Sequence, residues 1–202
     1  VEFEENLIKK LSKIEDIVKK ATKLLEKDNM FDKENIGYFW GMMGTRPYMR
    51  ARNMKITILM DLGRYTDAIK ECEEMLKLCE SDNLGIRYTL IGLYCILEKF
   101  EECEKLYKKF NEYSAFMLFP MAIMYFKKGD YKKSKKFLRD LQGVNPYIIK
   151  ILKNDITTVE NSENIEYYAP GSREEASIII ADLLYLLITV PSFMRFIGME
   201  LK

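Results

Sequence analysis

The chain has 202 residues, of which 48% are hydrophobic and 31% charged. This balance is typical of a folded domain with a sizeable core, and it excludes a disordered tail. Because 32 basic and 31 acidic side chains leave a net charge of only +1, no overall positive field draws the chain to nucleic acid or to an acidic membrane.

The histidine and cysteine content limits which catalytic and metal-binding sites the chain could form. The sequence has no histidine, which removes the commonest general base and the ordinary zinc sites. The cysteines are Cys72, Cys79, Cys95 and Cys103. They show no CxxC spacing and occupy apolar helical positions, so we expect small core residues in a reduced, cytoplasmic protein. We expect no metal, no cofactor and no enzyme activity within the chain.

The first element expected is an amphipathic helix. Apolar residues recur at three- and four-residue steps from Phe3 to Leu25, with lysine and glutamate between them. We expect this helix, within residues 1–36, to cap the fold by packing on the rest of the chain; a coiled coil is the alternative, but the seam covers only about three heptads. The chain begins at Val1 without a methionine or a signal-peptide pattern, so we expect its natural N-terminus to lie elsewhere.

The next segment, GYFWGMMGTRPYMRARN at residues 37–53, places three arginines near the start of a second helix. Arginine there costs stability unless an anion or a buried partner offsets the helix dipole. With Thr45 as N-cap and Pro47 in the first turn, Arg46 and Arg50 could converge on a carboxylate or phosphate. Alternatively, the arginines are structural. In that case Arg50, Arg52 and Arg87 pair with acidic residues such as Asp61, Asp67, Glu71 or Glu102.

Three later segments share one pattern. Each has an aromatic residue, a small residue three positions on, and large residues seven and ten positions on, with Cys72 the weakest match. The aromatic residues are Tyr65, Phe100 and Tyr131, and the small ones are Ala68, Cys103 and Ser134. These steps place all four positions on one helical face, and an apolar helical stretch precedes each segment. Each unit is therefore predicted to be a helix hairpin.

The hairpins resemble the tetratricopeptide repeat. The units lie 35 and 31 residues apart, close to that repeat's period of about 34, and Asn145-Pro146 closes the third unit as proline commonly does. The resemblance implies an all-α solenoid of about three hairpins across 37–146, with units at about 49–80, 84–112 and 115–146. Capping helices at 1–36 and 147–202 would complete one globular unit, since such hairpins cannot bury their faces alone.

A closer resemblance is carried by five segments. They are FWGMMGTRPYMRARNMKITILMDLGRYTDAI, SDNLGIRYTL, VNPYIIKIL, YYAPGSREEA and VPSFMRFI. Over about residues 31–197 the chain is similar to a family of bacterial tetratricopeptide-type proteins, themselves distantly similar to the suppressor-of-tumorigenicity-7 proteins. Leu84 departs from the family's glutamine, and Phe196-Ile197 from its tryptophan-leucine. The resemblance implies the repeat fold and no particular reaction, so no catalytic residue is carried over.

The repeat register predicts a groove lined by the first helix of each hairpin. Its expected residues are Arg46, Arg50, Asn53, Thr57, Tyr88, Phe116, Phe119, Ile123 and Phe126. Such a groove suits an apolar or aromatic partner segment with an acidic group near Arg50. Alternatively, the chain fills it itself, because the stretch from Glu174 to Val190, read as one helix, is apolar around most of its circumference and too short to cross a bilayer.

We therefore expect a non-catalytic protein-interaction module that binds a protein or peptide. Two alternatives stay open: an anion or RNA binder that uses Arg46, Arg50 and the lysine-rich segment from Lys127 to Arg139, and an accessory domain of a larger enzyme. The near-zero net charge argues against nucleic acid. A homodimer through the N- or C-terminal apolar helices is a further option.

Overall fold

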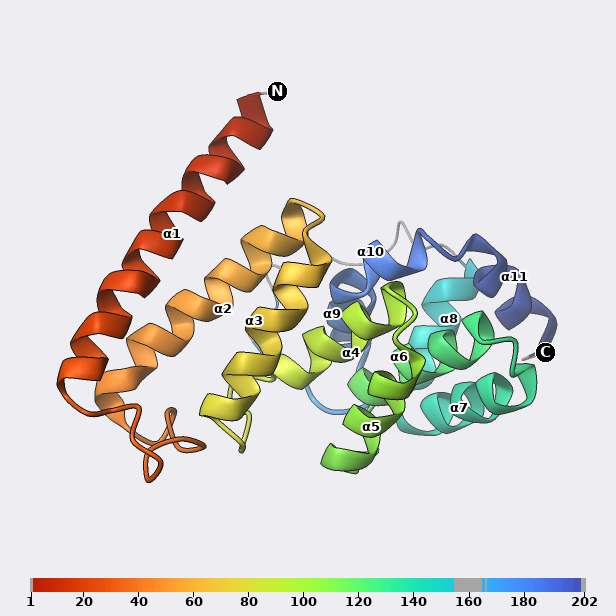
Figure 1. Ribbon diagram of the computed structural model, residues 1–202. Helices are drawn as coiled ribbons and strands as arrows, with labels where there is room; N and C mark the ends of the chain where they lie inside the picture. Colours follow the sequence, from red (N-terminus) through yellow and green to blue (C-terminus); the bar gives the residue numbers. More distant parts are fainter. Residues whose placement is uncertain (1, 155–164, 166, 201–202) are drawn as a thin grey trace. The chain divides into compact units, whose positions relative to one another are not determined.

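The computed structural model describes residues 2–154, 165 and 167–200 (Figure 1). In this part of the chain the regular elements are all helices, which confirms the all-α expectation. Contacts group the chain into two compact units, Val1–Leu93 and Tyr94–Lys202. This division differs from the expectation of one globular unit. Among the described residues, no helix is both long and apolar enough to cross a membrane.

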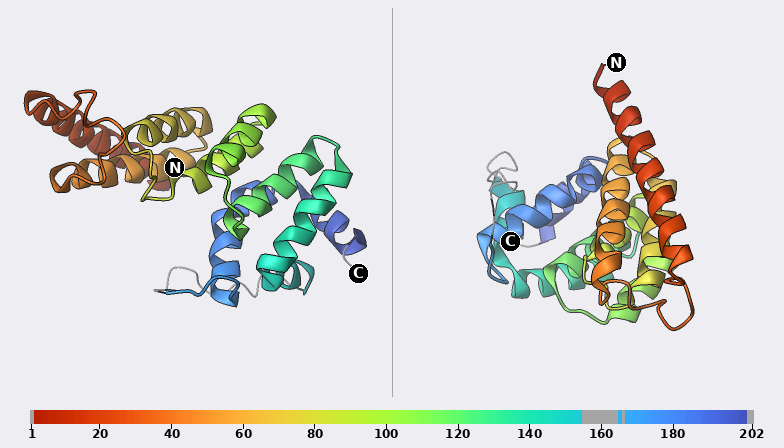
Figure 2. Two further views of the ribbon diagram at one scale, coloured as in Figure 1. Left: turned by 90° about the horizontal axis from the view of Figure 1, so that it is seen from below. Right: turned by 90° about the vertical axis from the view of Figure 1, so that its left-hand side faces the viewer.

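The first unit contains α1 (Glu2–Lys27), the 3-10 turn η1 (Met43–Thr45), α2 (Arg46–Asp61) and α3 (Tyr65–Leu78). Helix α4 (Ile86–Ile96) begins in this unit and ends in the second. Helix α1 packs along α2, and α2 packs against α3; Figures 1 and 2 show the three side by side. The α1 seam buries Leu7, Leu11 and Ile14, so the helix does pack on its own chain as expected.

The segment between α1 and α2 is fixed to the end of α3. The amides of Gly37 and Phe39 both donate to the carbonyl oxygen of Leu78, at 3.1 and 3.0 Å, and the Glu80 amide donates back to Gly37. Gly37 takes a φ of +96°, a conformation that favours glycine. Phe39 is fully buried, with its ring centroid 5.1 Å from that of Phe31. Backbone hydrogen bonds to the end of α3 and the burial of the Phe39 ring therefore both fix the FWG segment.

The DNLGIRY segment sets the start of α4. The buried Asp82 carboxylate accepts hydrogen bonds from the amides of Ile86, at 2.7 Å, and Arg87, at 3.0 Å. It thus satisfies two of the donors that every helix start leaves without a partner. Gly85 has a φ of +69°, and a Cβ there would lie 3.1 Å from the Tyr88 ring. Both acid and glycine are needed for this turn.

The second unit is built around α6 (Ala115–Lys127) and α7 (Tyr131–Val144), preceded by α5 (Phe100–Phe110). Its later helices are α8 (Pro146–Asn154), α9 (Arg173–Asp182), α10 (Leu184–Leu187) and α11 (Pro191–Glu200). Helix α6 packs against α5 and α7, and α8 packs against α7, α9 and α11. Every residue over 117–125 is buried, because α6 has neighbours on most of its circumference.

Several sequence expectations can be checked on these elements. The small repeat residues Ala68, Cys103 and Ser134 are all fully buried, as one shared helical face predicts. All four cysteines are free and buried, which confirms their expected place in the core. The single helix expected from Glu174 to Val190 is wrong: α9 ends at Asp182, and the short α10 follows. Residues 155–164 of the expected C-terminal cap lie outside the described residues.

A polar contact joins the start of α8 to the start of α9. The Asn145 side-chain amide donates to the Glu175 carboxylate at 2.8 Å, and the Gly171 amide donates to the same oxygen at 2.8 Å. Asn145 also donates to the Ser172 carbonyl, while the Ser172 hydroxyl caps α9. The Asn-Pro and GSREEA segments therefore meet in one buried network.

Candidate functional site: a tryptophan between two arginines

The arginines near the start of α2 have different partners. Arg52 is structural: it forms a hydrogen-bonded ion pair with Glu71 of α3, and Lys55 donates to the other Glu71 oxygen at 2.9 Å. The Arg52 and Glu71 side chains are only 11% and 9% exposed. Burial alone raises the pKa of the Glu71 carboxyl, but Arg52 and Lys55 outweigh it and hold the pKa below its usual value. This pair joins α2 to α3.

Arg87 is also structural, although its partner is not one of the acids expected. Its guanidinium donates to the Asp82 carboxylate at 2.9 Å and to the Tyr88 hydroxyl at 2.5 Å. The same guanidinium lies 4.1 Å from the Tyr88 ring centroid. Tyr88, which was expected to line a groove, is thus part of the turn that starts α4.

Among the described residues, Arg46 and Arg50 have no acidic partner. Each guanidinium lies over the Trp40 ring, at 5.5 and 5.6 Å from its centroid, and the Arg46 Nε donates to the Trp40 carbonyl oxygen at 2.8 Å. Within residues 2–154, 165 and 167–200 neither guanidinium forms an ion pair. The remaining N–H donors of both groups are available to a ligand. We call Trp40, Arg46 and Arg50 the Trp40 site.

The surroundings of Trp40 explain its position. Phe39 on one side of it is buried, and the buried Thr45 hydroxyl donates to the Met42 carbonyl at 2.8 Å and also contacts the Phe39 carbonyl. Thr45 stands at the N-cap of α2 as expected, but its side chain makes no capping hydrogen bond, because its hydroxyl bonds within the preceding loop. Pro47 does lie in the first helical turn, as expected. This loop holds Trp40 half-exposed beside the arginines.

A polar stripe continues the Trp40 site along α2. Arg46, Arg50, Asn53 and Thr57 recur at four-, three- and four-residue steps, so they share one helical face. Arg50 and Thr57 are exposed, and Arg46 and Asn53 are half-buried. The basic end of this stripe lies beside Trp40, and its other end is uncharged.

Two apolar side chains of the same loop are exposed. Tyr38 is 72% and Met43 is 80% exposed. Met54 of α2 is also exposed, whereas Met117, Met121 and Met124 of α6 are buried. The loop that carries Trp40 therefore also offers apolar surface.

The expected groove residues divide between the two units. Arg46, Arg50, Asn53 and Tyr88 belong to the first, and Phe116, Phe119, Ile123 and Phe126 to the second. Phe119 and Ile123 have no exposed surface. The C-terminal part of the second unit covers this aromatic set, with Phe119 and Phe126 against Phe193 of α11 and Phe116 against Tyr168. Self-occupation was an open alternative, and α11 and Tyr168 contact this aromatic set.

Part of the lysine-rich segment is ion-paired. Lys127, Lys128, Lys133 and Lys135 form ion pairs with Glu98, Glu104, Asp130 and Glu200. The Phe137 ring, an aromatic ring among the α7 lysines that could stack on a base, has its centroid 5.3 Å from that of Tyr125. Both observations weaken an RNA-binding surface on α7, because nucleic acid needs free cations and open rings.

The described residues offer neither an activated cysteine nucleophile nor a cluster of metal ligands. Burial raises the pKa of the Cys95 thiol to about 12 and also raises the pKa values of Cys72 and Cys103. These thiols are therefore protonated at neutral pH and unsuited to nucleophilic attack. In the part of the chain that the structure describes, no cluster of three or more acidic or cysteine side chains could hold a metal ion.

Comparisons with protein-family models, with curated proteins and with solved structures find no match for this chain. The resemblance to the bacterial repeat family therefore stays a prediction. Sequence reasoning singled out Arg46 and Arg50, but it missed the role of Trp40. The signal was present: one tryptophan in the chain, flanked by a buried phenylalanine and a glycine, comes six residues before an arginine pair.

Proposed function

We propose that the chain is a non-catalytic protein-interaction module, and that its Trp40 site binds an acidic group on a partner segment. One observation carries the proposal: two guanidiniums lie over one half-exposed indole, and neither has an acidic partner in the described residues. Elsewhere in this unit, Arg52 and Arg87 have nearby carboxylates.

The Trp40 site is suited to a carboxylate. Arginine presents planar, fork-shaped donors that match a carboxylate, and such charge-assisted bonds are about twice as strong as neutral ones. Stacking on Trp40 orients the guanidiniums before a ligand arrives, which reduces the entropy lost on binding. Hydrogen bonds to Leu78 and a buried Phe39 hold the loop that provides Trp40. The site is therefore preorganised.

The exposed apolar side chains suggest the rest of the partner segment. Tyr38 and Met43 lie on the loop that carries Trp40, and large exposed aromatic and methionine side chains are common in interaction surfaces. Asn53 and Thr57 extend the surface along α2 with hydrogen-bonding groups. We therefore propose a partner segment that combines acidic residues with an apolar or aromatic residue.

A tetratricopeptide-like arrangement of the helix pairs is part of the same proposal. It is supported by the consecutive packing of α2 with α3 and of α6 with α7, each pair with a turn glycine of positive φ, Gly63 and Gly129. The burial of the small residue in the first turn of α3, α5 and α7 also supports it. Repeat folds of this kind commonly serve as binding surfaces.

Fluorescence titration tests the Trp40 site directly, because Trp40 is the only tryptophan in the chain. The probe is an acetylated and amidated nonapeptide with two glutamates flanking a phenylalanine; a matched peptide has glutamine in place of glutamate. We expect the acidic peptide to change Trp40 emission saturably. The double variant Arg46→Gln, Arg50→Gln should weaken its binding by about tenfold or more.

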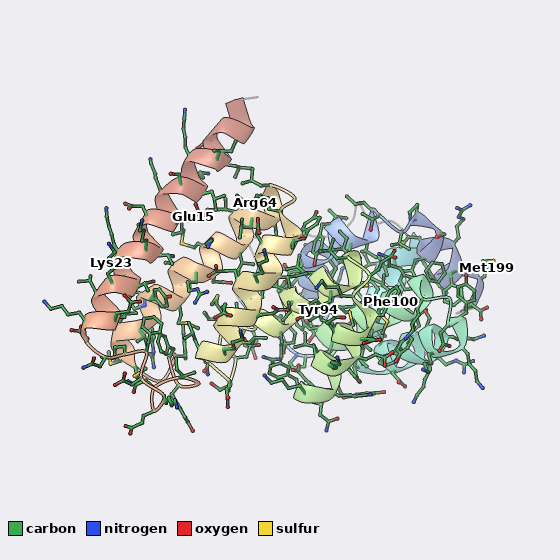
Figure 3. All side chains as sticks on the ribbon, viewed as in Figure 1. Glu15, Lys23, Arg64, Tyr94, Phe100 and Met199 are labelled. Carbon is green, nitrogen blue, oxygen red and sulfur yellow. The ribbon has the colours of Figure 1, made fainter. Side chains whose placement is uncertain are left out.

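The matched control is Arg64→Gln. Arg64 is an exposed arginine of the same unit, labelled in Figure 3, and its ion pair with Asp67 is exposed. This variant should bind the acidic peptide as the parent does, because salt screens the effect on affinity of a single exposed charge that lies outside the Trp40 site. Equal affinity for the acidic and glutamine peptides, or equal losses in the double and control variants, would contradict the proposal.

A second candidate, RNA binding, is tested in the same assay. Arg46 and Arg50 favour it only as anion ligands, and on α7 Lys133 and Lys135 are already ion-paired. A 12-nucleotide oligouridine would replace the peptide. Binding of oligouridine alone, with a steep loss of affinity between about 50 and 200 mM salt, would favour RNA over a protein partner.

A further inference from the structure

The second unit contains a hollow beside the aromatic contacts of α6 and α11. Its volume is about 510 Å³, within the range of small-ligand pockets. It lies where α6 ends, α7 begins and α11 passes, and Met199 on its rim is labelled in Figure 3. Its walls are Phe126, Tyr131, Phe196 and Met199, with Ser192 and Arg195 at the polar side.

Three aromatic rings form the apolar wall. The centroid of Phe126 lies 5.4 Å from that of Tyr131 and 5.1 Å from that of Phe196, and the Tyr131 and Phe196 centroids are 5.7 Å apart. Rings this close leave no space between them for a cation. They instead present one continuous apolar surface, to which the exposed Tyr131 and Met199 side chains contribute.

The charges around the hollow are unequal. Glu200 lines it, but its carboxylate is hydrogen-bonded to the Lys135 ammonium. Arg195 is exposed and has no ion pair within the described residues. After the Glu200 and Lys135 charges cancel, the described residues therefore leave one uncompensated positive charge, that of Arg195, beside the aromatic wall of the hollow.

We propose that this hollow, the α11 pocket, binds an apolar residue that carries a free carboxylate, as at the C-terminus of a peptide. The apolar side chain lies on Phe126, Tyr131 and Phe196, and the carboxylate bonds to the Arg195 guanidinium. The Ser192 hydroxyl, which also lines the hollow, provides a second donor for the same carboxylate. An apolar surface with a single cation selects for this combination, because neither an uncharged apolar group nor an anion alone uses both.

The inference is independent of the Trp40 site. The α11 pocket lies wholly in the second unit, and the Trp40 site lies in the first. A carboxylate at a C-terminus also differs from the acidic side chains proposed for the Trp40 site. Each proposal can therefore fail without the other.

Methionine NMR separates the two sites. In the full chain labelled with ¹³C-methyl methionine, Met199 reports on the α11 pocket and Met43 on the Trp40 loop. A Met199→Leu variant assigns the signal. The first probe is acetyl-Gly-Gly-Phe with a free carboxylate, and the second is its C-terminal amide. The third probe, acetyl-phenylalanine, distinguishes binding of a peptide terminus from binding of a small free carboxylate.

We expect the tripeptide acid to shift the Met199 signal saturably and to leave Met43 unchanged. The tripeptide amide should bind at least about tenfold more weakly than the acid. In Arg195→Gln the affinity for the acid should fall to the affinity that the parent has for the amide. The matched control Arg139→Gln removes an exposed α7 arginine that has no ion pair among the described residues, and it should bind normally. Tyr131→Ala should weaken acid and amide alike.

Two results would overturn the inference. The first is equal binding of acid and amide, which would make the α11 pocket merely apolar. The second is an unchanged Met199 signal with all probes up to about 5 mM, because a pocket with one ion pair and one buried ring should reach millimolar affinity. Because Arg195 is exposed, Arg195→Gln should leave the thermal unfolding midpoint unchanged, so that a loss of binding cannot be assigned to unfolding.

Discussion

At the scale of the residue, an arginine's role in the first unit follows from what lies within reach of its guanidinium. Arg52 reaches the buried Glu71 carboxylate on the neighbouring helix, and Arg87 reaches Asp82 in the preceding turn. Both Arg46 and Arg50 lie over the Trp40 indole, and Arg46 also donates to the Trp40 carbonyl oxygen. Residue type alone could not separate these roles, because all four are arginines within or beside apolar helices.

The Glu71 pair gives a prediction about stability. Glu71→Gln leaves Arg52 and Lys55 partly buried without a counter-charge, which should cost about 3 kcal/mol of unfolding free energy at pH 7. Urea unfolding followed by circular dichroism measures it. The control Glu74→Gln removes an exposed partner of Lys77 and should change the free energy by less than about 0.5 kcal/mol.

The same pair makes stability depend on pH. The Glu71 carboxyl has a folded-state pKa below its unfolded value of 4.5, so its contribution is present above pH 4.5 and is lost as the pH falls through the folded pKa. The difference between the parent and Glu71→Gln should therefore shrink in urea titrations below pH 4.5. A difference that stays constant down to pH 2 would contradict the assigned ion pair.

At the scale of the element, short polar contacts decide where helices start. Asp82 accepts from two amides at the start of α4, and Glu175 accepts from Asn145 and Gly171 at the start of α9. Both carboxylates are buried, so their loss would leave donors without water or partner. The motifs that contain them therefore stabilise the fold.

We expect Asp82→Ala to cost about 2 kcal/mol of unfolding free energy, because it removes a helix cap and the Arg87 partner together. Asp82→Asn keeps an acceptor for one amide and should cost less. Hydrogen exchange at Ile86 and Arg87 locates the effect. Unchanged protection of these amides in Asp82→Ala would show that the carboxylate does not cap α4.

Helix α11 gives a second prediction at this scale. Phe193 is fully buried and touches the rings of Phe119 and Phe126. Phe193→Ala should cost about 3 to 5 kcal/mol, from lost burial and the cavity left behind. It should also increase binding of the dye ANS, as the aromatic surface of α6 becomes accessible. A normal unfolding free energy would mean that α11 does not cover α6 in solution.

At the scale of the whole molecule, the division into two compact units predicts separate opening events. Cys72 belongs to the first unit, and Cys95 and Cys103 to the second; all three are fully buried. Burial raises their pKa values, so a thiol reagent at pH 8 can react only after local or global unfolding.

Pulsed alkylation with mass spectrometry checks this prediction. In moderate urea we expect Cys95 and Cys103 to share one rate constant and Cys72 to have another, because each unit opens as its own cooperative body. In full denaturant all should react at similar rates, which controls for intrinsic reactivity. A single rate constant for all three in moderate urea would show that the two units unfold as one.

The all-α class, the α1 seam, the buried repeat positions and the buried cysteines could be predicted from the sequence, since helical periodicity depends on neighbours a few residues apart. Arg46, Arg50 and Asn53 were also identified as one face of α2 for the same reason. The contact of Phe119 with Phe193 could not be foreseen from periodicity, because α11 lies more than 60 residues later in the chain.

Only the tertiary structure decided which charges find partners and which apolar faces stay exposed. The periodicity of α2 and α6 states which side chains share a face, but it does not state what lies opposite that face. Glu71 neutralises Arg52, whereas the FWG loop places an indole and no carboxylate beside Arg46 and Arg50. Both arrangements depend on contacts between distant segments, whose geometry is set by packing and not by local residue spacing.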